Sequence, residues 1–108
     1  MKTTYLSALV LLASASTLPF ASQAAGDAMA GKAKAATCMG CHGVPSYTNV
    51  YPTYHVPKLG GQHAQYLVSA LQAYKAGQRS HKTMQAQARS LSDQDMEDIA
   101  AFFAHSGK

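Results

Sequence analysis

The sequence predicts a small all-α fold with three main helices joined by loops. Three stretches combine helix-forming residues with recognisable helix ends, and no stretch alternates apolar and polar residues as a half-buried strand would. The chain of 108 residues is long enough for one small domain and excludes a multidomain enzyme. Charged residues make up 13% and hydrophobic residues 47%, which excludes a disordered, solvated chain.

Residues 1–24 precede the predicted domain. They carry one charge, Lys2, followed by an uncharged apolar run and the small-residue ending Ala21-Ser22-Gln23-Ala24. This pattern predicts a secretory signal peptide that is cleaved after Ala24, because the apolar run is too short to span a membrane. An uncleaved N-terminal anchor is the alternative. We therefore expect a periplasmic domain over residues 25–108 with no integral membrane span after processing.

The first helix of the domain is predicted from Ala28 to Thr37, with Asp27 as its N-cap. The stretch 43–61 holds three of the chain's four prolines and is predicted to be a loop.

The second and third helices follow that loop. The second is predicted over Gln62–Ala76, where apolar residues share one face and Gly77 ends the helix. Residues 78–90 are polar, and their structure is ambiguous from the sequence. Ser92, with an acid three residues on, begins the last helix, which ends near His105. Its buried stripe is predicted to consist of Met96, Ile99, Ala100 and Phe103.

The formal net charge of +4, which falls by one without Lys2, is scattered and too small to indicate nucleic-acid binding. A domain this short usually needs a disulfide, a metal or a cofactor to supplement its core. The only cysteines lie in Cys38-Met39-Gly40-Cys41-His42. This C-x-x-C-H pattern is typical of c-type haem attachment, in which two thiols bind the haem vinyl groups and the histidine ligates the iron.

Other interpretations of the two cysteines fit less well. A redox dithiol would need a preceding strand, whereas residues 27–36 are alanine-rich and poor in strand formers. Zinc would need two further ligands at regular spacing. A disulfide would close too small a loop to stabilise the fold.

A second axial ligand is expected from a thioether or an imidazole. Met29 and Met39 are badly placed, and Met96 belongs to the apolar stripe, which leaves Met84 in a polar stretch. His81 is the rival ligand, and Met84 as a simple gap filler is the structural alternative.

Further motifs make the whole domain resemble a class I cytochrome c, especially the bacterial cytochrome c553 type and one half of the di-haem cytochrome c4. The motifs are Cys38–Gly43, Pro57–Gln62, Tyr66-Leu67, Gly77–Arg79, Met84, Leu91–Asp93 and Ala100–Phe103. The resemblance implies a class I cytochrome c fold around one covalently attached haem, with Cys38 and Cys41 holding the haem. His42 and Met84 would ligate the iron.

Further roles come from the same resemblance. The carbonyl of Pro57 would accept a hydrogen bond from the proximal histidine, and Leu59 would pack on the haem. Gly31 would let the first helix cross the last beside Phe102 or Phe103. Ala35 replaces an aromatic that many relatives carry, so we expect a looser crossing. The aromatic insert 47–55 is also unusual, and it either packs around the haem or selects a partner.

The resemblance implies a periplasmic one-electron carrier rather than an enzyme, acting with redox partner proteins. Lys75, Arg79 and Lys82, together with His81, could steer an acidic partner, or they could form an ordinary solvated face. Two alternatives are a haem subunit of a larger periplasmic oxidoreductase and a haem protein that binds or senses a ligand.

Overall fold

The computed structural model describes residues 26–107 and is mostly helical, which confirms the predicted all-α class. The predicted signal peptide lies outside the described residues. The helices are α1 (Ala28–Lys34), α2 (Ala36–His42), α3 (Ala64–Lys75), α4 (Lys82–Arg89) and α5 (Asp93–His105), and the strands are β1 (Thr48–Asn49) and β2 (Tyr54–His55). None of the helices in residues 26–107 has the length and apolarity needed to cross a membrane.

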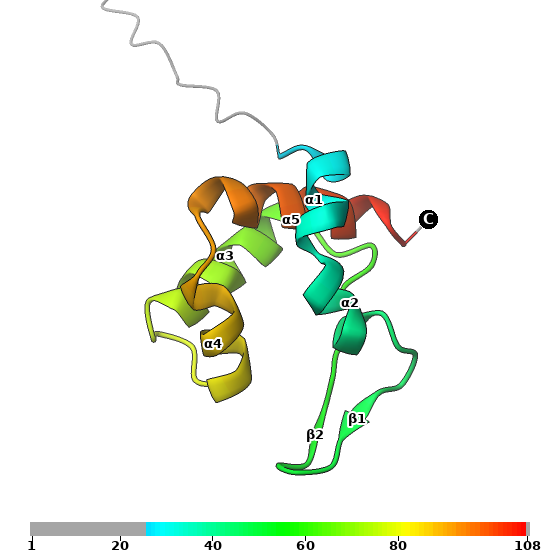
Figure 1. Cartoon of the computed structure of the whole chain (residues 1–108), viewed down its shortest axis with the longest axis vertical. Helices are drawn as coiled ribbons and strands as arrows, with labels where there is room; N and C mark the ends of the chain where they lie inside the picture. The colour runs from blue at the N-terminus through cyan, green and yellow to red at the C-terminus, as the bar shows by residue number, and fades with distance from the viewer. Residues whose placement is uncertain (1–25, 108) are drawn as a thin grey trace, which may run out of the picture.

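Helix α5 is the centre of the fold, because both α1 and α3 pack against it (Figure 1). The contact with α1 is made at Gly31, where an added Cβ would lie 1.9 Å from the carbonyl oxygen of Asp98 and 3.0 Å from Cβ of Phe102. Only a residue without a side chain allows so close an approach of two backbones. The helix crossing expected at Gly31 is therefore confirmed, with Phe102 as the aromatic neighbour.

A buried carboxylate ties the same two helices together. Asp98 is 3% exposed and accepts hydrogen bonds from Lys34 Nζ at 2.6 Å, the Asp27 amide at 2.8 Å and Gln94 Nε2 at 2.9 Å. These donors, with Lys34 first among them, lower the pKa of Asp98 to about 2. Lys34 also pairs with Asp95 at 2.7 Å. The charge of Asp98 is thus compensated by groups from both helices.

Two helix ends form as the sequence predicts. Gly77 follows α3 with a φ of 76°, and the amide of Gln78 donates to the carbonyl of Ala73 at 2.9 Å, which is the pattern of a Schellman motif. At the start of α5, the Ser92 hydroxyl accepts from the Asp95 amide at 3.1 Å, and the Asp95 carboxylate accepts from the Ser92 amide at 2.9 Å. This reciprocal pair is a capping box.

The core lies between α5 and the helices on either side of it. Its buried members are Ala35, Leu67, Ile99, Ala100 and Phe103. Met96, the other member of the predicted stripe on α5, is fully buried as well. The prediction for this helix face is confirmed because every position of the stripe is inside.

The predicted C-terminal end of the first helix is wrong. It was expected to stop at Thr37, with the cysteine motif beyond it, but the motif lies inside α2. The backbone bends at Ala35, where ψ is 3°, while the Met39 amide still donates to the Ala35 carbonyl at 3.0 Å. The low helix propensities of Thr37 and Gly40 cost roughly 1 kcal/mol each at most, so a helix that is packed and hydrogen-bonded can include them.

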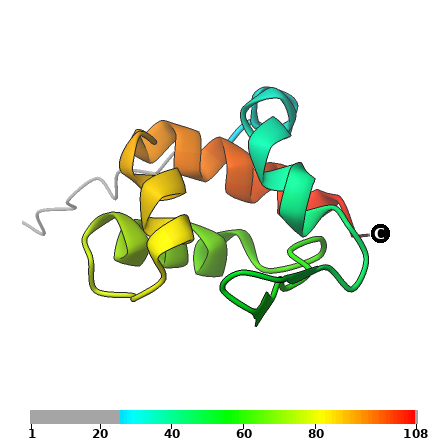
Figure 2. The same cartoon turned by 60° about the horizontal axis from the view of Figure 1, so that its bottom comes forward.

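Two further segments differ from the prediction. Residues 78–90, whose structure was ambiguous, contain α4 as an additional helix, and the expected loop 43–61 contains β1 and β2. The two strands pair antiparallel with Thr48 opposite His55 and Asn49 opposite Tyr54. In Figure 2, α4 lies at one end of the α3–α5 pair and this hairpin lies at the other. The space between them is where the site is found.

Candidate cofactor site

A cavity of about 510 Å³ opens between α2, the hairpin, α3, α4 and α5. That volume falls within the range of roughly 300–1,000 Å³ that is usual for ligand and cofactor pockets. Its walls are mainly apolar, and the aliphatic and aromatic side chains that form them are Val56, Leu59, Leu67, Leu71, Leu91, Ile99 and Phe103. An apolar group of cofactor size fits such walls, provided that a few polar groups fix its orientation.

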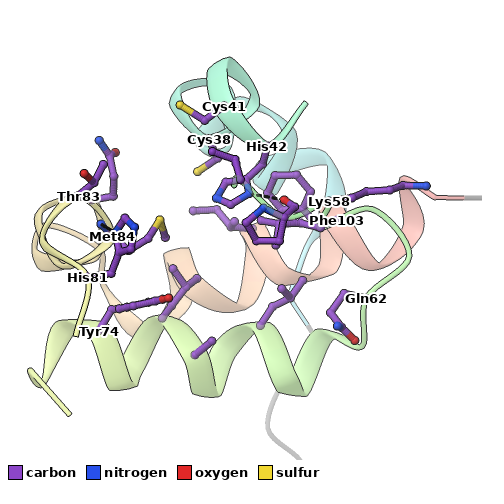
Figure 3. Close-up of a pocket in the computed structure, with 18 of the residues that line it drawn as sticks. Cys38, Cys41, His42, Lys58, Gln62, Tyr74, His81, Thr83, Met84 and Phe103 are labelled. Carbon is purple, nitrogen blue, oxygen red and sulfur yellow. Dashed lines mark hydrogen bonds between the residues drawn. The ribbon is translucent and has the colours of Figure 1, made fainter. Parts of the chain in front are cut away.

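The helix α2 supplies the reactive groups of one wall. Cys38, Cys41 and His42 all line the cavity, and Figure 3 shows them on the same helix above it. The spacing i, i+3, i+4 places side chains on one face of a helix. Both cysteines are free thiols, and Cys38 is half-buried while Cys41 is exposed. Two thiols and an imidazole therefore face the same apolar space.

The imidazole of His42 is held in one orientation. Its Nδ1 lies 2.7 Å from the carbonyl oxygen of Pro57, which also lines the cavity. A carbonyl oxygen can only accept, so Nδ1 carries the proton and the lone pair of the neutral ring is on Nε2. Such a hydrogen bond fixes the ring and makes it a better metal donor. The contact between His42 and Pro57 that the family resemblance implies is present.

Helix α4 forms the facing wall. Met84 lines the cavity and is half-buried, and Figure 3 shows its thioether directed toward the space below His42. The helix begins at His81, whose Nδ1 accepts from the Met84 amide at 3.3 Å. This bond requires Nδ1 to be unprotonated and uses it as a helix cap. Met84 is thus presented from the first turn of a capped helix.

His81 is in turn packed by the hairpin. The ring of Tyr54, on β2, meets the His81 ring edge-on with 4.6 Å between centroids and an interplanar angle of 82°. The Tyr54 hydroxyl lies 3.4 Å from Oγ1 of Thr83 on α4. Tyr54 therefore contacts both His81 and Thr83 across the gap between the hairpin and α4. No periodic pattern in the sequence predicts this contact, because it joins a two-residue strand to a helix cap.

The alternative metal and redox interpretations of the cysteines gain no support. Within residues 26–107, no three His, Cys, Asp or Glu side chains gather into a group that could hold a metal ion. Burial raises the pKa of the Cys38 thiol, whereas a reactive dithiol depends on a lowered pKa. Leu59 lies in the cavity wall and packs against the core, which is the position expected for a side chain against a bound cofactor.

Comparison with known proteins supports a cofactor site in this cavity. The family model described as Cytochrome c matches residues 28–106. Over 81 residues the chain is 47% identical to cytochrome c4 of Pseudomonas aeruginosa, covering 75% of this chain and 39% of that protein. Over 83 residues it is 45% identical to cytochrome c-554(548) of Halomonas halodenitrificans, covering 74% of this chain and 96% of that one.

A solved structure agrees with the fold. The structure of Acidithiobacillus ferrooxidans cytochrome c4 superposes with a TM-score of 0.56 at 25% identity, covering 77% of this chain and 52% of that chain. The match to the Pseudomonas protein spans only about two fifths of that protein's length, whereas the match to the Halomonas protein spans nearly all of it.

Proposed function

Because the chain belongs to the cytochrome c family, we propose that it is a periplasmic one-electron carrier whose single covalent haem c has histidine and methionine axial ligands. In this proposal Cys38 and Cys41 form the thioether bonds, His42 is the proximal ligand and Met84 is the distal ligand. The observation that carries the proposal is the facing arrangement of His42 and Met84 across one apolar cavity of cofactor size.

Each residue then has a specific task. The two thiols, one turn apart on α2, fix the cofactor to the helix that also carries His42. The hydrogen bond from His42 Nδ1 to the Pro57 carbonyl keeps Nε2 free to donate to iron. Leu59 and the other apolar walls exclude water, which lowers the local dielectric. When bound, the haem supplies exchange of one electron between ferrous and ferric iron.

The axial pair favours electron transfer over ligand binding. A thioether and an apolar pocket both stabilise the less charged ferrous centre, so we expect a positive reduction potential. His81 is a weaker candidate for the distal ligand, because its Nδ1 already accepts the Met84 amide and its ring packs against Tyr54. With both axial positions filled, little of the chain has to move during the reaction.

Spectroscopy of the exported holoprotein tests this assignment. A pyridine haemochrome spectrum should report one haem with two thioether links per chain. Met84→Ala should remove the weak far-red band of sulfur-ligated ferric haem, lower the potential and allow rapid carbon monoxide binding to the reduced protein. Met29→Ala is the matched control, because Met29 lies on α1 and is 78% exposed. This variant should leave the band, the potential and carbon monoxide binding unchanged.

Two outcomes would count against the proposal. If the ferric wild type lacks the far-red band, and His81→Ala but not Met84→Ala opens the reduced protein to rapid carbon monoxide binding, the distal ligand is His81. If the wild-type reduced protein binds carbon monoxide rapidly and completely at neutral pH, the site is one for ligand binding or sensing. The proposed export is checked separately by the N-terminal sequence of periplasmic protein, which should begin at Ala25.

A further inference from the structure

The tip of the β1–β2 hairpin, residues 50–52, presents an unusual surface. Tyr51 is 92% exposed and Val50 is 67% exposed, and Pro52 beside them is exposed as well. Figure 1 shows the hairpin projecting away from the helices. None of these three residues is among those that line the cavity. A cluster of exposed apolar and aromatic side chains instead marks a surface used in binding.

The hairpin tip is held in a defined shape. The ladder pairs the residues on either side of it, with Asn49 opposite Tyr54. The Asn49 side-chain amide donates to the Pro52 carbonyl at 2.7 Å, and the Thr53 hydroxyl donates to the Val50 carbonyl at 2.7 Å. Because the tip is already ordered, a partner that binds it pays little of the entropy that ordering a loop would cost.

The hairpin tip also lies beside the cofactor site. Tyr54, His55 and Val56, which follow the tip after Thr53, line the cavity. Tyr54 additionally reaches His81 and Thr83 at the start of α4. A protein seated on the tip would therefore lie against the rim of the cavity, where electron transfer to a bound haem needs it.

The charges around this rim have one sign. The chain has five acidic residues, namely Asp27, Asp93, Asp95, Glu97 and Asp98, and none lies between positions 28 and 92. The cavity lining includes Lys58 and Arg79 and no carboxylate, and Lys82 lies beside it in α4. The rim is basic, so it attracts carboxylates and repels a second copy of itself.

We propose that the hairpin tip is the apolar contact by which this chain docks onto a redox-partner protein that presents an apolar patch ringed by carboxylates. This inference rests on the proposed function, because it names the partner chemistry of the same site. Val50 and Tyr51 supply the desolvated centre of the contact, and Lys58, Arg79 and Lys82 supply its charged rim. The contact is small, as is typical of transient electron-transfer complexes.

The probe is a gold electrode coated with a mixed monolayer of carboxylate-terminated and methyl-terminated thiols. Holoprotein adsorption is measured by mass uptake on a quartz crystal, and the redox wave is recorded on the same surface. The double variant Val50→Ser/Tyr51→Ser should bind the mixed monolayer roughly five- to tenfold more weakly than wild type, as expected for loss of an interface aromatic. Its reduction potential and melting temperature should stay unchanged.

Three comparisons make the test specific. Met29→Ser removes an exposed apolar side chain from α1 and should bind like wild type. On a purely carboxylate monolayer, the double variant and wild type should bind equally, since only charge acts there. Binding of both should weaken as ionic strength rises.

Equal binding of wild type and the double variant to the mixed monolayer would overturn the proposal. Sedimentation that shows a wild-type dimer dissociated by Val50→Ser/Tyr51→Ser would overturn it too, because the occupant of the tip would then be a second copy of the chain. A wild-type film without a redox wave would refute the carrier function instead, while mass uptake would still report on the tip.

Discussion

Replacing Gly31 by alanine tests the close backbone contact between α1 and α5. Alanine is better than glycine in a helix interior by about 0.5–1 kcal/mol, so propensity alone predicts a more stable protein. The added carbon, however, would lie 1.9 Å from the carbonyl oxygen of Asp98 and 2.5 Å from its carbon. Those atoms belong to the backbone of α5 and cannot rotate away. We therefore expect the steric effect to dominate.

The size of the effect follows from the distance. Favourable contacts lie near 3.5–4.0 Å, so α1 must move away from α5 by more than about 1 Å, which also stretches the hydrogen bonds to Asp98. Overpacking costs about 1–3 kcal/mol, and a backbone contact this short belongs in the upper part of that range, about 2–3 kcal/mol. After subtraction of the propensity gain of about 0.5–1 kcal/mol, we expect a net loss of about 1–2.5 kcal/mol. For a domain of this size, that lowers the melting temperature by roughly 4–20 °C.

The assay is thermal unfolding of haem-loaded protein followed by far-ultraviolet circular dichroism, with equal haem content verified for each variant. Gly40→Ala is the matched control: Gly40 lies inside α2, and no heavy atom lies within 4 Å of an added Cβ. It should stabilise the protein by about 0.5–1 kcal/mol. The reasoning fails if Gly31→Ala melts at or above the wild-type temperature, or if Gly40→Ala loses as much stability.

Three other perturbations address the site and the α1–α5 contact. His81→Ala should remove the α4 cap, lower the free energy of unfolding by about 1 kcal/mol and weaken the far-red band of the ferric protein. His81→Asn, which can still cap the helix, should keep the stability and the band. Equal behaviour of the two variants would contradict a capping role. Tyr54→Leu should speed carbon monoxide binding to the reduced protein, because it removes the ring contact with His81. Tyr54→Phe loses only a 3.4 Å contact with Thr83 and should not change the rate. Stopped-flow mixing measures both rates. The pKa of Asp98 is lowered from 3.8 to about 2 on folding, so the stability from its ionisation is present above about pH 4 and is lost as pH falls toward 2. The urea midpoint should therefore decline less between these pH values in Asp98→Asn than in wild type, and parallel declines would refute this.

The sequence was sufficient where a local pattern determines the structure. The residue type at Gly77 is enough to end α3, and Ser92 with Asp95 is enough to begin α5. The cysteine motif is equally local, because its spacing is set by the chemistry of the proposed haem attachment rather than by the fold. These predictions needed no knowledge of which elements pack together.

The sequence was insufficient where tertiary packing decides. Helix α4 has no Ser, Thr, Asp or Asn as its N-cap, and its one buried residue is Ala88. Neither a typical cap nor an apolar stripe in the sequence therefore predicts this helix. His81 caps it instead. The hairpin strands have two residues each, too few for alternation to be visible. The position of Met84 on the facing wall depends on α4 and on the hairpin that packs against it. The sequence therefore indicates Met84 as a ligand only by elimination and by resemblance.

The distribution of charge connects the fold with its proposed partner. Asp27 caps α1, Asp95 completes the capping box of α5, and Asp98 receives Lys34 and the Asp27 amide at the helix crossing. Both ion pairs within residues 26–107 involve Lys34. Most of the carboxylates thus stabilise the contact between α1 and α5, the two helices that approach closely at Gly31.

Of the basic side chains at the cavity, Lys34 is paired with carboxylates, whereas Lys58, Arg79 and Lys82 have no partner among the ion pairs of the described residues. Their charges are therefore available to a molecule outside the chain. The same folding requirement that draws acids to α5 leaves the rim positive, and the apolar hairpin tip stands on that rim. If this reasoning holds, moving a carboxylate to the rim by Lys82→Glu should weaken adsorption to the mixed monolayer without lowering the melting temperature, because Lys82 is exposed and forms no ion pair there. A loss of stability without a loss of adsorption would show that the charge distribution serves the fold and not a partner.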